Sequence, residues 1–188
     1  MSAKTHYSNA IMRAFEFYHR RNNFVYLYGA KGQIATPAFI EELFRLEPKH
    51  YAKYSANEKS EIIMNSVGKI AFDCSGFVCA CFDWIKPAYS EGLYNQRSVE
   101  YPTYRESRAG CMLYTTFNGT GRHIGIDCGS GMFAHMGNES TFKNRALGID
   151  SVRLEWFENF PNYWEHYFEH KSVDYSGTTA GVIDDEYR

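Results

Sequence analysis

The stretch Phe72-Asp73-Cys74-Ser75-Gly76-Phe77-Val78 places a cysteine directly after an aspartate that can cap a helix. An aspartate at the N-cap accepts hydrogen bonds from the first backbone N–H groups, so the pattern predicts a helix that starts at Cys74 and ends at Pro87. In the first turn of a helix, unpaired N–H groups and the helix dipole favour the thiolate of a cysteine over its thiol. Cys74 is therefore a candidate nucleophile, and the same N–H groups are suited to stabilise an oxyanion.

The other cysteines lack this capping context. The chain holds five cysteines, an odd number that excludes a fully paired disulfide framework. Free cysteine is among the most buried residue types, so packing is the preferred interpretation for the remainder. These are Cys79, Cys81, Cys111 and Cys128. Gly76, in turn, is expected to keep the approach to the Cys74 sulfur open.

A nucleophilic thiol needs a base, and His123 is the candidate. Alternation along a strand puts His123 and Gly125 on the face opposite Ile124, where the glycine is expected to leave room for a substrate. His135 follows beyond a glycine-rich turn centred on Gly129. A hairpin folded there places the two imidazoles opposite each other on one face, provided that the loop holds an odd number of residues. His135 would then orient His123 and fix its tautomer.

Zinc binding is the main alternative for two histidines and a cysteine, which can hold the ion with an open fourth position. However, the sequence has neither a C-x-x-C pair nor an H-E-x-x-H helix, and Cys79-Ala80-Cys81 has the wrong spacing for a zinc knuckle. We therefore favour thiol chemistry with no metal and no other cofactor.

Signals along the rest of the chain predict helices first and antiparallel strands later. Helices are expected from Ser8, after the Thr36-Pro37 cap, after the capping box of Ser55 and Glu58 as far as Gly68, and after Asp73. Strands are expected at Phe24–Tyr28, Met112–Phe117, Ile124–Cys128, Met132–Met136 and within Val152–Phe168. The polar residues 88–110 are predicted to form a long connection. This order of elements is typical of an α+β domain.

Composition narrows the class of protein. The 188 residues suit one domain, and 44% hydrophobic residues can form a core that needs neither disulfides nor a structural metal. A formal net charge of −2 argues against nucleic-acid binding. No apolar run is long enough for a membrane span, and the first residues lack the apolar core of a secretory signal. The protein is therefore expected to be made in the cytoplasm, with its thiols reduced.

Taken together, these segments resemble the NlpC-type cell-wall cysteine peptidases, a papain-like family. Residues 72–78 resemble the family's nucleophile motif, which they match at every position. The segment Arg122-His123-Ile124-Gly125-Ile126, with Phe133-Ala134-His135, resembles its His-Val-Gly-Ile strand and the following strand that carries the third polar residue. Residues 26–30 and 110–114 are similar to the family's Tyr-x-Trp-Gly-Gly and Pro-Gly-Asp-Leu segments.

The resemblance implies a papain-like fold in which N-terminal helices pack on a small antiparallel sheet. It implies Cys74 as nucleophile, His123 as general base and His135 as the residue that orients it. It further implies that the substrate side of the site is lined by Tyr26, Asp73 and Ser75. In members that cut after a free amino terminus, the matching Tyr and Asp are associated with binding the amine.

Domain boundaries follow from the same comparison. We expect one peptidase domain over residues 1–170, with a helical insertion at about 31–69 where the family has a short connection. Residues 171–188 contain few large apolar side chains and are expected to form a flexible tail or a segment that docks onto a protein partner.

The expected function is hydrolysis of amide bonds in the peptide stems of bacterial peptidoglycan. The absent signal favours a phage-type lysin or a virion-associated lytic enzyme, which reaches the cell wall after release, by injection or as part of a virion. Two alternatives stay open: an acyltransferase or deamidase effector on the same scaffold, and a structural or interaction protein that retains the fold.

Overall fold

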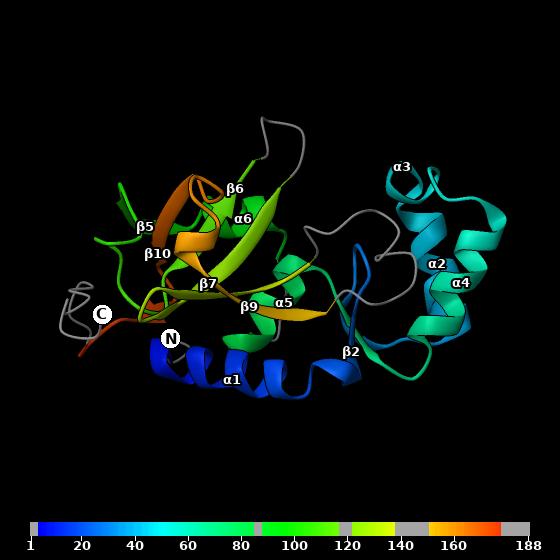
Figure 1. Cartoon of the computed structure of the whole chain (residues 1–188), viewed down its shortest axis with the longest axis horizontal. Helices are drawn as coiled ribbons and strands as arrows, with labels where there is room; N and C mark the ends of the chain where they lie inside the picture. The colour runs from blue at the N-terminus through cyan, green and yellow to red at the C-terminus, as the bar shows by residue number, and fades with distance from the viewer. Residues whose placement is uncertain (1–3, 85–87, 117–121, 138–150, 178–188) are drawn as a thin grey trace.

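The computed structural model of the chain describes residues 4–84, 88–116, 122–137 and 151–177 (Figure 1). It is a mixed α+β fold built around a six-stranded antiparallel sheet of order β5-β10-β6-β7-β8-β9. Its strands are β5 (Arg97–Tyr101), β6 (Met112–Thr115), β7 (His123–Gly129), β8 (Met132–Met136), β9 (Val152–Trp156) and β10 (His166–His170). The α+β class expected from the order of elements is confirmed.

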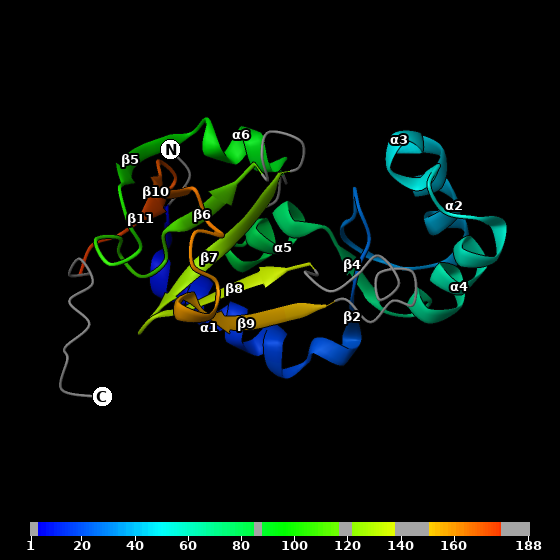
Figure 2. The same ribbon diagram turned by 45° about the horizontal axis from the view of Figure 1, so that its top comes forward.

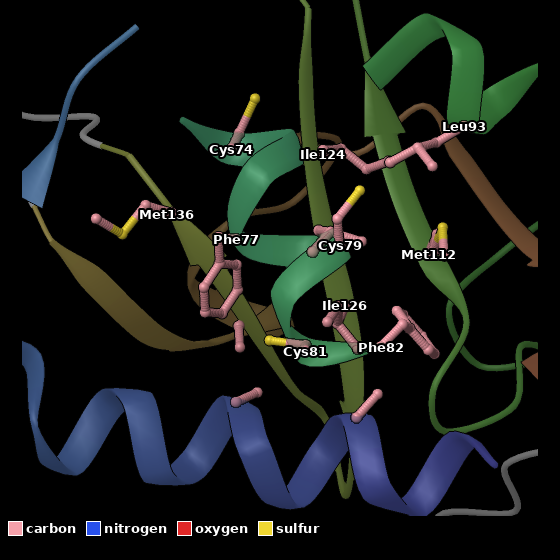
Figure 3. Close-up of a cluster of buried hydrophobic side chains, with 14 of the residues drawn as sticks. Cys74, Phe77, Cys79, Cys81, Phe82, Leu93, Met112, Ile124, Ile126 and Met136 are labelled. Atoms are coloured by element: carbon pink, nitrogen blue, oxygen red, sulfur yellow. The ribbon is translucent and has the colours of Figure 1, made fainter. Parts of the chain in front are cut away.

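Helices cover one face of this sheet (Figures 1 and 2). Helix α5 (Cys74–Cys81) packs against β7 and β8, and α1 (Tyr7–His19) packs against α5, β7 and β9. Alternation along β7 turns Ile124 and Ile126 toward the helices, where they meet Phe77 and Phe82 in the main core (Figure 3). Helix α5 ends at Cys81, well before Pro87, and Asp83 then takes a left-handed φ of 59°.

The opposite face of the sheet carries a smaller, aromatic core. Leu113, Phe133 and Tyr167 point to this side from β6, β8 and β10. They are covered by Phe157 from the short helix η2 (Phe157–Asn159) and by Trp164 from the connection to β10. His123 and His135 lie on this face as well, because they have the same strand parity as Phe133 and Gly125.

A second sheet of order β2-β4-β3 carries the helical insertion. It consists of β2 (Phe24–Tyr26), β3 (Lys31–Ile34) and β4 (Ile70–Phe72), and the insertion consists of α2 (Pro37–Leu46), α3 (Pro48–Tyr51) and α4 (Ala56–Ser66). We call these three helices the helical arm. The arm packs on its own small sheet through a separate core, and Figure 1 shows it on the far side of that sheet from the six strands. Of the N-terminal helices that were expected to pack on the main sheet, α1 and α5 do so, and the helices of the arm do not.

Local capping accounts for where the arm's helices begin. Thr36 accepts a hydrogen bond of 3.2 Å from the N–H of Phe39, and Pro37 follows at the first helical position. Ser55 and Glu58 form the predicted capping box, which is confirmed at the start of α4.

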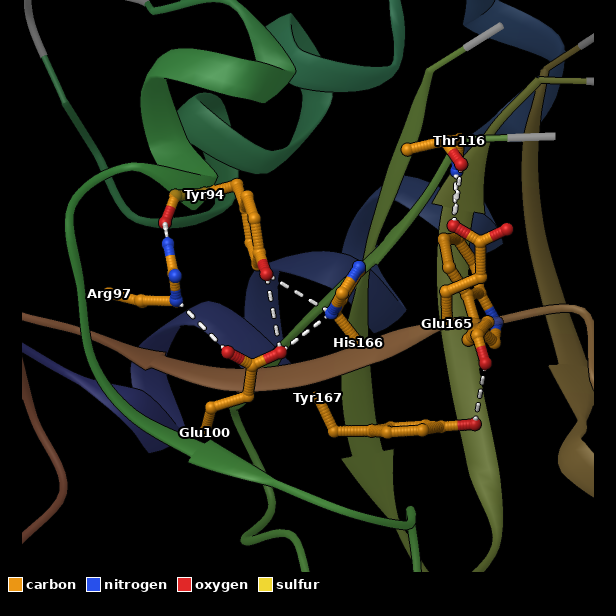
Figure 4. A network of polar contacts seen from close by, with 8 residues as sticks. Tyr94, Arg97, Glu100, Thr116, Glu165, His166 and Tyr167 are labelled. Atoms are coloured by element: carbon orange, nitrogen blue, oxygen red, sulfur yellow. Dashed lines mark hydrogen bonds and ion pairs between the residues drawn. The ribbon is translucent and has the colours of Figure 1, made fainter. Parts of the chain in front are cut away.

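The prediction of a long connection at residues 88–110 is wrong. This segment contains α6 (Ser90–Tyr94) and edge strand β5, which pairs with β10. Neither leaves a clear pattern, because α6 has no side-chain cap and most of β5 is exposed without apolar alternation. Polar contacts hold this edge instead: Glu100 accepts from Arg97 at 3.0 Å and lies 2.6 Å from Nδ1 of His166 (Figure 4).

The expected tail at 171–188 begins too early. Strand β11 (Val173–Asp174) pairs in parallel with β1 (Thr5–His6), so both ends of the described chain meet in one small sheet. Tyr175 is buried, and its hydroxyl donates a hydrogen bond of 3.3 Å to the carbonyl of Gly110. Residues 171–177 are therefore part of the fold, and residues 178–188 lie outside the described residues.

Candidate active site

The candidate nucleophile lies in the first turn of α5, where strand β4 runs directly into the helix cap. Asp73 is the N-cap residue, and its Oδ1 accepts a hydrogen bond of 2.6 Å from the N–H of Gly76. The Cys74 side chain belongs to the edge of the main core and is 7% exposed. Figure 3 shows its sulfur directed away from α1 and from the rest of that cluster.

The surroundings of Cys74 keep its sulfur protonated. Burial, followed by the negative charge of Asp73, raises the pKa of the thiol to about 12. The ammonium of Lys31 and the backbone N–H groups of Ile124 and Ser75 act in the opposite direction, but they do not outweigh the burial. The helix start alone predicted a thiolate. In the structure, the thiol needs a base to become nucleophilic.

His123 and His135 form a directly bonded pair. Nε2 of His123 lies 2.8 Å from Nδ1 of His135, and both rings are buried. Strand register explains how they meet: His135 pairs with Gly125, while His123 pairs with Thr115 on the other neighbouring strand. The two imidazoles are therefore offset along the hairpin, not directly opposite as the sequence predicted.

The turn accounts for this offset. Ser130 and Gly131 occupy the corner with φ values of 52° and 76°, which makes a two-residue loop between Gly129 and Met132. An even loop alone would have changed the parity of one strand. A bulge between Asp127 and Gly129 adds the residue that restores it, so both histidines stay on one face.

His135 is held neutral. Burial first, and then the nearby His123 and Arg153, lower the pKa of its imidazole well below the ordinary value. A neutral ring whose Nδ1 accepts the Nε2–H of His123 carries its own proton on Nε2, and this atom is buried without a hydrogen-bond partner among the described residues. With the shared proton on Nε2 of His123, the other ring nitrogen of His123, Nδ1, is the basic one.

Trp164 is a residue of this site that the sequence did not reveal. Its ring stacks on His123, with centroids 5.4 Å apart and planes at 16°, and meets His135 edge-on. Gly125 makes this possible, because a Cβ there would lie 3.0 Å from Cη2 of Trp164 and 2.9 Å from the carbonyl oxygen of Ala134. The space beside Gly125, expected to be for substrate, is therefore filled by the protein's own tryptophan. No local pattern could link it to His123, since it lies in an aromatic-rich segment much later in the chain.

Lys31 is the second residue that sequence reasoning missed. Its ammonium lies 2.7 and 2.5 Å from the carboxylate oxygens of Asp73 and 2.6 Å from the hydroxyl of Ser75. Asp73 and Ser75 were predicted to line the substrate side. Both are buried, and both are bonded to Lys31 and to each other. Lysine on a short, mostly exposed strand gives no sequence signal for such a position.

Tyr26, the remaining predicted substrate-binding residue, lies in β2 with its ring buried. Gly137 brings this ring close to the base: a Cβ at that glycine would lie 3.6 Å from Cε2 of Tyr26 and 3.0 Å from Cε1 of His123. The N–H of Ile124, next to His123 in sequence, interacts with the Cys74 sulfur. The structure thus brings the thiol, the two imidazoles and Tyr26 into one region of the molecule.

No protein-family model, no curated protein and no solved structure matches the chain. Among the described residues, no cluster of three or more histidine, cysteine or acidic side chains is suited to bind a metal ion. In the same part of the chain, no helix combines the length and the apolar character that crossing a membrane requires.

Proposed function

We propose that the chain is a cysteine peptidase or amidase with a papain-like arrangement, in which Cys74 is the nucleophile, His123 the general base and His135 the residue that orients the base. The buried bond of 2.8 Å between the two imidazoles carries this proposal. Burying two imidazoles and a thiol costs free energy, so a purely structural core rarely contains such a group. Buried titratable side chains of this kind are typical of functional sites.

The chemistry begins with proton transfer. Nε2 of His123 is hydrogen-bonded to His135, so Nδ1 of His123 is the atom that takes the proton from the Cys74 thiol. The resulting imidazolium still donates its Nε2–H to neutral His135, which stabilises the charge in place. The thiolate then attacks the substrate's carbonyl carbon, and N–H groups in the first turn of α5 stabilise the oxyanion.

Acyl transfer completes the cycle. His123 returns its proton to the leaving amine, the C–N bond breaks and the acyl group stays on the sulfur as a thioester. Water that gives its proton to His123 then hydrolyses the thioester and restores the thiol. Each step uses only residues of this chain and water.

The proposed substrate is the peptide stem of bacterial peptidoglycan, which suits a phage-type lysin. The support is the residue pattern of the nucleophile and histidine segments. The helical arm adds a feature near the thiol: His50 of α3 stacks on Tyr28 at 4.2 Å between centroids, and the Tyr28 hydroxyl is within electrostatic range of Cys74. This aromatic pair is partly exposed, so it is suited to pack against a substrate.

Digestion of purified peptidoglycan followed by mass spectrometry of the fragments tests the proposal. A new free amine on the diamino acid is expected for an endopeptidase, and release of intact stems is expected for an amidase. Cys74→Ala is the matched control, because it removes only the sulfur. A folded wild-type protein that leaves every fragment unchanged would contradict the proposal and favour an acyltransferase or an interaction protein.

A further inference from the structure

The carboxylate beside the nucleophile is already paired with a cation from the chain itself. Lys31 approaches both oxygens of Asp73, while Oδ1 also accepts from the Gly76 N–H and from the Ser75 hydroxyl at 2.9 Å. The Lys31 and Asp73 side chains are only 12% and 6% exposed. All three donors of the ammonium have a partner, because the third contact is to Ser75.

The backbone holds Lys31 in this position. It pairs with Phe72 across the small sheet, directly before Asp73, and the Asp73 N–H donates a hydrogen bond of 2.8 Å to the carbonyl of Ala30. Gly76 permits this approach, since a Cβ there would lie 2.7 Å from the Ala30 oxygen and 3.1 Å from Cα of Lys31. The glycine of the nucleophile motif therefore makes room for Lys31, not for substrate as the sequence suggested. The ring of Tyr89 lies 4.9 Å from the ammonium.

Charge balance around the thiol depends on this lysine. The titratable groups that act on Cys74 come from several elements: Asp73 at the cap, Lys31 on β3, Tyr28 after β2 and Tyr114 on β6. Of these, Asp73 and Lys31 form an ion pair, so their charges balance each other. A positively charged substrate group therefore meets no net negative charge beside the thiol, and replacing Lys31 would leave the Asp73 carboxylate as an unpaired buried charge.

We propose that Lys31 determines specificity by occupying the Asp73 carboxylate, so that the substrate must present a blocked, amide-linked nitrogen there and not a free amine. The inference rests on the proposed function and deepens it, because it selects internal, N-acylated peptide stems over fragments that begin with a free amino terminus. It also reverses the role that the resemblance implied for Asp73.

Matched stem peptides, identical except for a free or an acetylated terminal amine, test this specificity. Wild type is expected to cleave the acetylated peptide at least as efficiently as the free one, measured as kcat/KM. Lys31→Met is expected to shift the ratio at least tenfold toward the free amine, because Asp73 is then open. Lys31→Arg retains a cation and should keep the wild-type ratio, and Lys31→Met with Asp73→Asn should lose the gain. A tenfold preference of wild type for the free amine, or an unchanged ratio in Lys31→Met, would overturn the inference.

A second measurement does not depend on turnover. Iodoacetamide labelling of Cys74, followed by mass spectrometry of its peptide, reports whether a small amine such as alaninamide binds beside the thiol. Alaninamide should protect Cys74 in Lys31→Met and leave wild type and the exposed-lysine control Lys171→Met unprotected. Protection of wild type, or none in folded Lys31→Met, overturns the inference. If wild type cleaves neither peptide, the proposed function fails, while this labelling still decides the role of Lys31.

Discussion

The two halves of the candidate site solve the problem of burying polar groups in different ways. The thiol half contains two full charges, those of Lys31 and Asp73, which neutralise each other across N···O distances of 2.5 to 2.7 Å. The imidazole half relies on a neutral ring instead, because His135 is uncharged and is bonded to His123, whose ring stacks on Trp164. In the proposed mechanism, a new charge arises in both halves at once, when the proton moves from sulfur to imidazole.

Removing either partner of that proton transfer should have the largest effect. Cys74→Ala and His123→Ala are each expected to lower turnover by at least about 10⁴-fold, because nucleophile and base act as a unit. Circular dichroism should show that both variants stay folded, while the melting temperature of His123→Ala should fall, because the change leaves a cavity beside Trp164. Activity of Cys74→Ala on peptidoglycan within tenfold of wild type would exclude the mechanism.

A change that weakens only the orientation of the base should lower turnover less than removal of the nucleophile or the base. His135→Ala is expected to lower kcat by about 100-fold with little change in KM, because His123 loses the acceptor that fixes its ring. His135→Asn keeps an acceptor oxygen and should recover part of the loss. Equal activities of the two variants would show that the bond at 2.8 Å does not position the base.

Each half of the site contains a glycine that lets two segments approach closely, and replacing it should lower the stability of the fold. Gly76→Ala and Gly125→Ala each place a methyl group within 3.0 Å of a backbone carbonyl oxygen, so each should lower the free energy of unfolding by about 2 kcal/mol. Gly92→Ala, where the nearest atom is 3.9 Å from the new Cβ, is the control and should be neutral or slightly stabilising. Urea unfolding of the three variants measures this. Loss in Gly92→Ala equal to the other two would refute the packing argument.

The smallest expected effect is a pH dependence of stability. Because the pKa of His135 is lowered in the folded state, the unfolded chain binds more protons below its ordinary value of 6.5, and stability should fall as the pH drops below that value. His170, whose pKa is lowered to about 4 by burial, acts in the same direction. Asp127 opposes them below pH 6, since burial raises its pKa to about 6.

Chemical unfolding of wild type, His135→Asn and Asp127→Asn between pH 7.5 and about pH 4.5 separates these groups. His135→Asn should show a shallower decline than wild type, and Asp127→Asn a steeper one below pH 6, because the opposing acid is gone. Identical curves for all three proteins would mean that these buried groups do not control acid stability.

Local signals in the sequence predicted the parts of this site that local structure determines. The helix start at Cys74 follows from the Asp73 cap, and β8 lies at the predicted residues Met132–Met136. Period-two alternation correctly predicted that His123 and His135 share a face of the sheet. It could not predict the strand register that offsets them, because the bulge before Gly129 depends on backbone geometry that no residue pattern encodes.

What the sequence could not predict depends on contacts between distant segments. Lys31 reaches Asp73 across 42 positions, and Trp164 stacks on His123 from the connection that precedes β10. In both cases the sequence correctly indicated that a glycine leaves space. The space beside Gly76 and Gly125 was expected to be for substrate, but it is filled by other parts of the protein. Thiol ionisation was also misjudged, since burial outweighs the helix terminus.

The pairing of β1 with β11 has a consequence for engineering. Thr5 lies beside Val173 and His6 beside Asp174, so the two ends of the described fold are neighbours in space. A short linker between them would close the chain into a ring at little entropic cost, and a new break in the exposed stretch around Ala52 and Lys53 would give a circular permutant. In such a permutant, the helical arm would become a pair of free ends while the thiol and imidazoles stayed on one continuous chain.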